Sequence, residues 1–288
     1  MNTFAWTTSA LAVLALAAST GAPAAVATPA LAPVTPWTYV LDSFNDGTEA
    51  QGVGNASAFE LYSIAYRQQG NAFNVAINSN LSVNRPYPRP NTALNGSINY
   101  GDLLLNFSDA DRFGASDALY GIRFDGANDT TLGPGLYRQV TVQSLAQVND
   151  GYGSFAQYGD RVRSLGGTPS WGGLELEPYF DPAAAPPTHL QSGQFLGELR
   201  FLDDAELAEL KFAEQGAIGQ YTFGFSVDAS LLPAGDFIAH LLTECANDGI
   251  AFAAQITDPQ AVPDGSGARS LAPMAILAGL LLQRHRQS

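Results

Sequence analysis

The stretch "QYTFGFSVD", residues 220–228, indicates most clearly how this chain folds. Four apolar residues alternate along it with polar or small ones, and these four are Tyr221, Phe223, Phe225 and Val227. Successive side chains of a strand point to opposite faces of a sheet, so this period of two predicts an antiparallel strand with one buried face.

Similar runs, separated by clusters of Gly, Pro, Asn and Asp, fill the middle of the chain. The expected strands are 37–44, 59–68, 73–81, 103–107, 119–124, 137–145, 194–201, 220–228, 237–245 and 250–256. The segment "DDAELAELKFAE", residues 203–214, predicts a helix with Asp203 or Asp204 as its N-cap. The pattern predicts an all-β protein, an antiparallel β-sandwich or jelly roll with one short helix, as one domain over 37–257.

Composition narrows the class of protein. The chain carries 13 Lys and Arg against 27 Asp and Glu, a formal net charge of −14, which disfavours binding to nucleic acid. Only 14% of the 288 residues are charged, and 29 are glycine, which is typical of turn-rich β proteins outside the cell. The single cysteine, Cys245, cannot form an internal disulfide, so stability has to come from the core.

The N-terminal segment has the features of a signal peptide. Residues 1–27 contain no charged side chain, "SALAVLALAAS" (9–19) is apolar, and "AVA" (25–27) fits a cleavage site. We expect export through the Sec machinery, removal of residues 1–27 by signal peptidase, and a Pro-rich linker over 28–36.

The C-terminal segment, residues 258–288, combines a turn, an apolar run and a basic end. The run 271–282 makes about 18 Å of helix, too short for a hydrocarbon core of about 30 Å. The basic end, Arg284, His285 and Arg286, would stay cytoplasmic by the positive-inside rule. The features favour a transient membrane stop, with an uncut anchor and a docked C-terminal helix as the alternatives.

The order of these features resembles the PEP-CTERM sorting signal of exosortase substrates, in its Val-Pro-Asp variant. The motif residues are Val262, Pro263, Asp264, Gly265 and Ser266. Arg269 and Pro273 interrupt the apolar run, which is a departure from the family pattern. The resemblance implies cleavage by an exosortase-type enzyme, followed by surface attachment or release.

The body is also similar to a group of bacterial, chiefly cyanobacterial, exosortase-dependent surface proteins. The similar stretches are 59–81, 100–107, 119–130, 135–162 and 230–251. The last is the most specific, with His240 followed by Glu244, Cys245, Asn247 and Asp248. This resemblance implies an exported surface protein and supplies no catalytic residues.

Three sets of residues are candidates for chemistry. His240 and Cys245 lie five residues apart, so on one strand they face opposite ways, which favours a buried free cysteine over a catalytic dyad. Asn-Asp pairs at 45–46, 128–129, 149–150 and 247–248 offer oxygen ligands for Ca²⁺, but they are also ordinary turn residues. "DSFNDGTEAQGV" (42–53) does not fit an EF-hand, so we expect no cofactor, and a bound Ca²⁺ stays an alternative with no site assigned.

Trp171 is the candidate glycan contact, because Glu175, Glu177 and Asp181 lie near it in the sequence. Neighbouring acids on an acidic protein are more often a solvated face. The sequence therefore favours a non-enzymatic cell-surface or extracellular-matrix protein with a structural or adhesive role. The alternative is a secreted protein that binds or cleaves polysaccharide.

Overall fold

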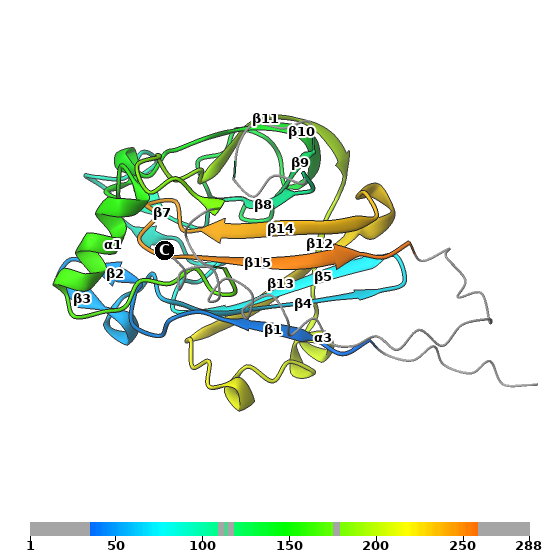
Figure 1. Cartoon of the computed structure of the whole chain (residues 1–288), viewed down its shortest axis with the longest axis horizontal. Coiled ribbons are helices and arrows are strands. Elements are labelled where there is room, and N and C mark those ends of the chain that lie inside the picture. Colours follow the sequence, from blue (N-terminus) through cyan, green and yellow to red (C-terminus); the bar gives the residue numbers. More distant parts are fainter. Residues whose placement is uncertain (1–34, 109–112, 114–117, 175–178, 259–288) are drawn as a thin grey trace, which may run out of the picture. The chain divides into compact units, whose positions relative to one another are not determined.

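A computed structural model of the chain describes residues 35–108, 113, 118–174 and 179–258. These residues form antiparallel sheets with few helices, which confirms the predicted all-β class (Figure 1). The signal peptide, most of the linker, the sorting motif and the basic end lie outside the described residues. Within the described ranges, no helix is long and apolar enough to cross a bilayer.

Two larger sheets make up the fold. The first has five strands in the order β1 (Thr38–Leu41), β4 (Leu61–Gln69), β5 (Ala72–Ser79), β13 (Tyr221–Asp228) and β12 (Arg200–Phe201). The second has six, in the order β11 (His189–Gly197), β10 (Gly135–Gln143), β9 (Leu119–Arg123), β8 (Leu103–Asn106), β14 (Gly235–Leu242) and β15 (Gly249–Ile256). Two short hairpins pair β2 (Thr48–Glu49) with β3 (Gly52–Val53), and β6 (Tyr87–Pro88) with β7 (Ser97–Ile98).

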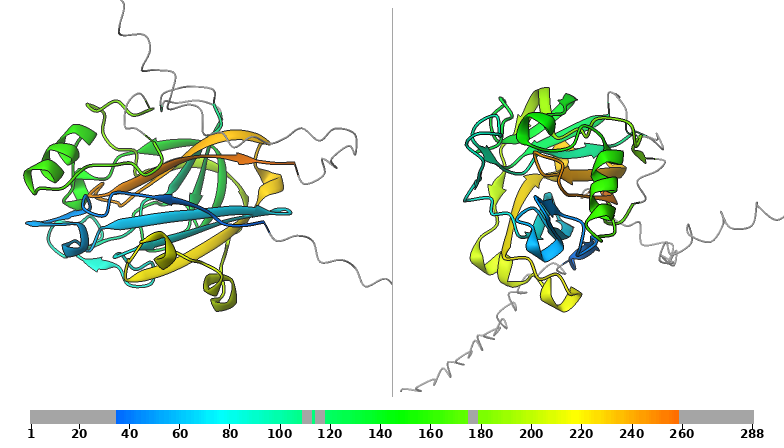
Figure 2. Two further views of the ribbon diagram at one scale, coloured as in Figure 1. Left: turned by 60° about the horizontal axis from the view of Figure 1, so that its bottom comes forward. Right: turned by 90° about the vertical axis from the view of Figure 1, so that its left-hand side faces the viewer.

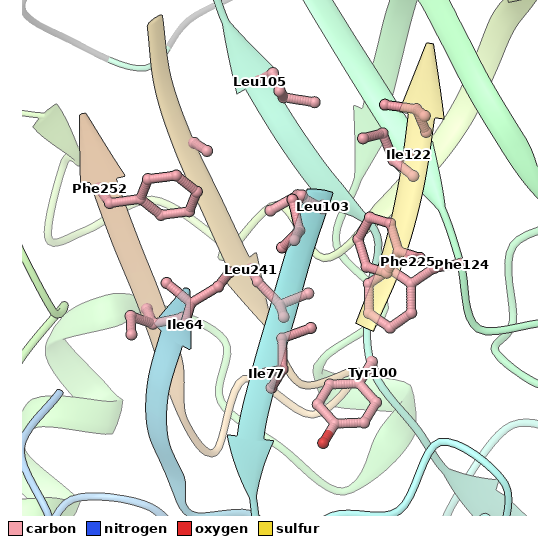
Figure 3. Packing of buried hydrophobic residues seen from close by; sticks show 14 of the residues in the cluster. Ile64, Ile77, Tyr100, Leu103, Leu105, Ile122, Phe124, Phe225, Leu241 and Phe252 are labelled. Carbon is pink, nitrogen blue, oxygen red and sulfur yellow. The ribbon is translucent and has the colours of Figure 1, made fainter. Parts of the chain in front are cut away.

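The main core lies between the two sheets (Figures 2 and 3). In β13, Phe223, Phe225 and Val227 enter this core, as the alternation predicts. The Phe225 ring stacks on Phe124, which directly follows β9, with 4.8 Å between ring centroids. Burying each such side chain contributes roughly 1.5 to 3 kcal/mol, so these contacts join the sheets.

The helices differ from the expectation. The structure contains a helix that was not predicted from the sequence, α1 (Phe155–Ser164). The Ser154 side chain caps its N-terminus. The expected helix over 203–214 is shortened to α3 (Asp204–Ala208), with a capping box between Asp203 and Glu206. The Lys211 amide donates a hydrogen bond to the Tyr39 hydroxyl at 2.7 Å, so it is not available for an α-helical bond. Short 3₁₀ turns occur at Gly54–Ala56, Gln147–Asn149, Ala213–Gln215 and Ala229–Leu231.

The expected strand 194–201 is wrong as one element. Strands β11 and β12 share it, and they lie in different sheets, so Glu198 and Leu199 pass from one sheet to the other. The remaining nine expected strands are present with shifted bounds.

Both ends of the described domain lie at one end of β4. Thr38, at the start of β1, pairs with Tyr66, and the Thr257 amide donates to Gln68 Oε1 at 2.8 Å. Helix α1 and the hairpin of β2 and β3 lie at the opposite end of the sheets (Figure 1). The nine residues of β4 separate the two ends by about 26 Å.

Candidate functional site

Four buried carboxylates gather where β4 begins, and we call them the carboxylate cluster: Asp42, Asp46, Glu60 and Asp248. Asp42 directly follows β1, Glu60 directly precedes β4, and Asp248 directly precedes β15, while Asp46 lies in the loop before β2. Asp46, Glu60 and Asp248 are 0% exposed and Asp42 is 8% exposed. The cluster therefore joins parts of the chain that are far apart in sequence.

Backbone amides hold one oxygen of Asp46 and one of Glu60. The Ser170 amide donates to Asp46 Oδ2 at 2.7 Å, and the Gly47 amide donates to Glu60 Oε2 at 2.7 Å. A Cβ on Gly47 would lie 2.5 Å from the Glu60 Cα, so this approach requires glycine. Asp46 Oδ1 and Glu60 Oε1 are buried without a hydrogen-bond partner among the described residues.

Asp42 shows the same division between its two oxygens. Its Oδ1 accepts hydrogen bonds from the amides of Ser43 and Gly172, both at 2.9 Å. Its Oδ2 is buried and has no partner in the described part of the chain. Three carboxylates therefore each present one fixed oxygen and one oxygen without a well-formed hydrogen bond. The Ser170 hydroxyl, the Tyr158 hydroxyl and the Asp46 amide still lie close enough to lower the pKa of Asp42, Asp46 and Glu60 respectively.

Asp248 differs, because both of its oxygens accept hydrogen bonds. The Leu61 amide donates to Oδ2 at 2.7 Å, and Oδ1 accepts from the Gly249 amide at 2.7 Å and the Tyr158 hydroxyl at 3.3 Å. A carboxylate oxygen has two lone pairs, so Oδ2 can still accept a second bond.

Burial raises the pKa of every carboxyl in the cluster. Desolvation of the charged form is the largest cause of the raised pKa in all four residues. Repulsion from Asp42 and Glu60 raises the pKa of Asp46 further, and repulsion from Asp46, Asp42 and Glu60 does the same for Asp248. The cluster therefore favours binding of positive charge, whether as protons or as a cation.

The geometry suits a shared ion. Asp42, Asp46 and Asp248 each offer an oxygen, and these atoms lie within 4.8 Å of one another. That limit is about twice a calcium–oxygen distance of about 2.4 Å, so one ion could touch all three.

A second buried polar group, which we call the His189–Glu244 network, consists of Asp102, Asn128, Thr130, His189 and Glu244. Asp102 accepts from Asn128 Nδ2 at 2.9 Å, from the Leu190 amide at 2.7 Å and from the Thr130 hydroxyl. Glu244 accepts from the Asn99 amide at 2.6 Å and the Asp129 amide at 2.7 Å, and lies 3.0 Å from His189 Nε2. All four carboxylate oxygens of Asp102 and Glu244 have partners.

The turn between β14 and β15 contains Glu244, Cys245, Asn247 and Asp248, four of the five residues on which the expected resemblance to surface proteins depends. Glu244 anchors the His189–Glu244 network and Asp248 belongs to the carboxylate cluster. Asn247 Nδ2 donates to the Thr48 carbonyl at 2.8 Å, which fixes the turn to β2. This short turn therefore connects both buried polar groups.

The structure does not bring His240 and Cys245 together. Cys245 is a buried free thiol in the main core, and burial raises its pKa to about 12. The His240 ring instead packs edge-on against Phe113 and Phe180 outside that core, and burial lowers its pKa to about 3. Both side chains are therefore uncharged at neutral pH.

Trp171 lines a cavity of about 590 Å³ beside α1. The indole is only 3% exposed and packs against Phe155 and Tyr158, with ring centroids 4.9 and 5.2 Å away. A sugar would have to enter the cavity to reach it. Glu175 and Glu177 lie outside the described residues.

Two of the four Asn-Asp pairs contribute an aspartate to the carboxylate cluster, Asp46 and Asp248. The other two pairs meet each other, since Asn149 Nδ2 donates to Asp129 Oδ2 at 2.9 Å. Asp42 was considered only as the first position of the rejected EF-hand loop, and Glu60 was not singled out, because a lone acid in a loop carries no signal of its own. No protein-family model, curated protein or solved structure matches the chain.

Proposed function

We propose that this chain is an exported, non-enzymatic protein that is displayed at the cell surface or in the extracellular matrix. Its two sheets would form a β-sandwich of the jelly-roll kind with a structural or adhesive role. Signal peptidase would remove residues 1–27, and an exosortase-type enzyme would process the tail after transient membrane insertion. The sequence features of both ends support this proposal.

The observation that carries the proposal is the position of the two ends of the domain. Thr38 and Thr257 both lie at the Tyr66–Gln69 end of β4, and the strands of the described residues all fall between residues 38 and 256. Cutting at both predicted sites would therefore leave the sheets and the core complete. The carboxylate cluster, at the other end of β4, would be held away from the attachment point.

The intact mass of the surface-exposed form tests both cuts at once. We expect a species that begins near Thr28 and ends near the Val262–Ser266 motif. A surface form that retains residues 271–288 would contradict exosortase-type processing, and one that retains residues 1–27 would contradict the signal peptide.

The cavity at Trp171 supports a second candidate, binding of extracellular polysaccharide, because its volume and aromatic lining are those of many ligand sites. Trp171→Ala should abolish binding on a glycan array, whereas Trp171→Phe, which keeps more of the packing against Phe155, should retain part of it. Failure of the unaltered chain to bind any polysaccharide would remove this candidate.

A further inference from the structure

We propose that the carboxylate cluster is a calcium site, in which side-chain oxygens of Asp42, Asp46 and Asp248 bind one Ca²⁺ and Glu60 adds negative charge beside it. This site is independent of how the chain is exported or processed. Four features of the cluster support a bound calcium ion: unpaired carboxylate oxygens, negative charge, side chains fixed by backbone amides, and ligand atoms that are all oxygen.

Three carboxylate oxygens of the cluster are buried without a hydrogen-bond partner among the described residues. In native structures nearly all buried polar atoms have a hydrogen-bond partner, and an unpaired one costs about 1 to 3 kcal/mol. Here three such atoms belong to neighbouring side chains of one cluster, on Asp42, Asp46 and Glu60. A bound cation would pair directly with Asp42 and Asp46, and its positive charge would offset the neighbouring Glu60 carboxylate.

The negative charge of the cluster is not balanced by a basic side chain among the described residues. None of the ion pairs formed by the described residues involves a carboxylate of the cluster. Buried carboxylates need a paired positive charge or a metal ion to stay ionised. The cluster brings up to four negative charges together, so a divalent ion compensates them better than a monovalent one.

Hydrogen bonds from backbone amides hold the carboxylates in place. Backbone amides of Gly172, Ser170 and Gly47 fix one oxygen of Asp42, Asp46 and Glu60 respectively. The position of each remaining oxygen is thereby set before an ion arrives. Such outer hydrogen bonds orient metal ligands and typically contribute 10- to 100-fold in affinity.

The ligand atoms favour calcium over other metals. All four side chains offer hard oxygens, whereas zinc and copper sites in proteins use imidazole and thiolate. Ca²⁺ accepts six to eight oxygens in flexible geometry and tolerates ligands from the protein on all sides. Mg²⁺ keeps several waters and is seldom enclosed by side chains, which fits poorly with carboxylates that are almost fully buried.

The ion would also join the two sheets. Asp42 and Glu60 adjoin β1 and β4 of the five-stranded sheet, and Asp248 adjoins β15 of the six-stranded sheet. The Asp42–Asp248 pair would link points separated by about 200 residues along the chain, the kind of closure that gains most from a cross-link. We therefore expect calcium to stabilise the whole domain.

Calorimetric titration of the chelator-treated full chain with CaCl₂ at neutral pH tests the proposal. We expect a single ion per chain, with the affinity lowered by roughly 100-fold or more in Asp46→Asn and in Asp42→Asn. Asp160→Asn makes the same chemical change on the surface of α1, where the Asp160 side chain is 82% exposed, and should bind like the unaltered chain.

Thermal melting in CaCl₂, MgCl₂ or chelator keeps the test decisive if a variant folds poorly. CaCl₂ at about 100 times the dissociation constant should raise the melting temperature of the unaltered chain by roughly 5 to 10 °C. A folded Asp46→Asn chain should show no such shift. The proposal is overturned if the unaltered chain neither binds nor responds to calcium, if Mg²⁺ acts as strongly, or if both variants bind normally.

Discussion

The domain buries carboxylates in two places, and the two places use their oxygens differently. In the His189–Glu244 network, Asp102 and Glu244 direct every oxygen at a donor from the protein itself. In the carboxylate cluster, Asp42, Asp46 and Glu60 each leave one oxygen unused. The two groups are connected through the turn that contains Glu244 and Asp248, although these two carboxylates share no hydrogen-bond partner.

This difference distinguishes a polar group that completes the fold from one that awaits a ligand. A buried network whose donors and acceptors are all paired adds rigidity without further partners, whereas a partly paired one is unfavourable. The first kind should be insensitive to calcium, and the second should depend on it.

Removing a partner from the completed network should have the largest effect. Asp102→Ala leaves the Thr130 hydroxyl, the Leu190 amide and the Asn128 side chain unpaired and buried, so we expect a loss of about 3 to 5 kcal/mol. Urea unfolding should show an equal loss with calcium and with chelator. A loss seen under one condition alone would break the distinction between the two groups.

Removing calcium from the unaltered chain should have the next largest effect. At a free concentration of about 100 times the dissociation constant, a bound ion stabilises the folded state by about 2.7 kcal/mol. Urea unfolding should therefore shift to lower midpoints in chelator. Asp160→Asn should show the same shift, and Asp46→Asn should show none.

The pH dependence of the calcium-free chain should give a smaller effect. Burial raises the pKa of Asp42 to about 7 and that of Glu60 to about 8, above their ordinary values of 3.8 and 4.5. At pH values between the ordinary and the raised pKa, the folded state binds more protons than the unfolded state. The stability that these protons contribute is therefore fully present below about pH 4 and is lost as pH rises through about 7 to 8.

Calcium replaces those protons, so the free energy of unfolding should fall less with rising pH when the ion is bound. Unfolding free energies of the calcium-free and calcium-bound chains at about pH 5 and about pH 8 would show this. A calcium-free chain that is more stable at the higher pH would contradict the expected sign. Asp42→Asn removes one of the two titrating groups and the charge that raises the pKa of Glu60, so it should reduce the fall.

Most strands were predictable because each repeats a local pattern. Phe223, Phe225 and Val227 alternate strictly, so periodicity identified the face of β13 that enters the main core. The expectation of a single buried face was wrong, because Gly224 and Ser226 on the other face are buried as well. Helix α1 escaped because Gly159 and several charged residues interrupt its apolar positions, although Phe155, Tyr158 and Val162 do follow a helical spacing. The division of 194–201 between two sheets depends on tertiary pairing, which no local pattern contains.

The carboxylate cluster could be predicted only in part. Calcium was a candidate ligand for Asp46 and Asp248 as members of Asn-Asp pairs, but so it was for Asp129 and Asp150, which lie elsewhere. Nothing in the sequence relates Asp42 or Glu60 to Asp248, because their proximity arises when β4 and β15 pack against each other. The fold, and no motif, assembles the site.

The most direct test of the calcium site is anomalous diffraction from crystals grown with CaCl₂. We predict a calcium peak about 2.3 to 2.6 Å from one carboxylate oxygen of each of Asp42, Asp46 and Asp248. A map at neutral pH with no such peak, in which water molecules or shared protons pair these oxygens, would contradict the account.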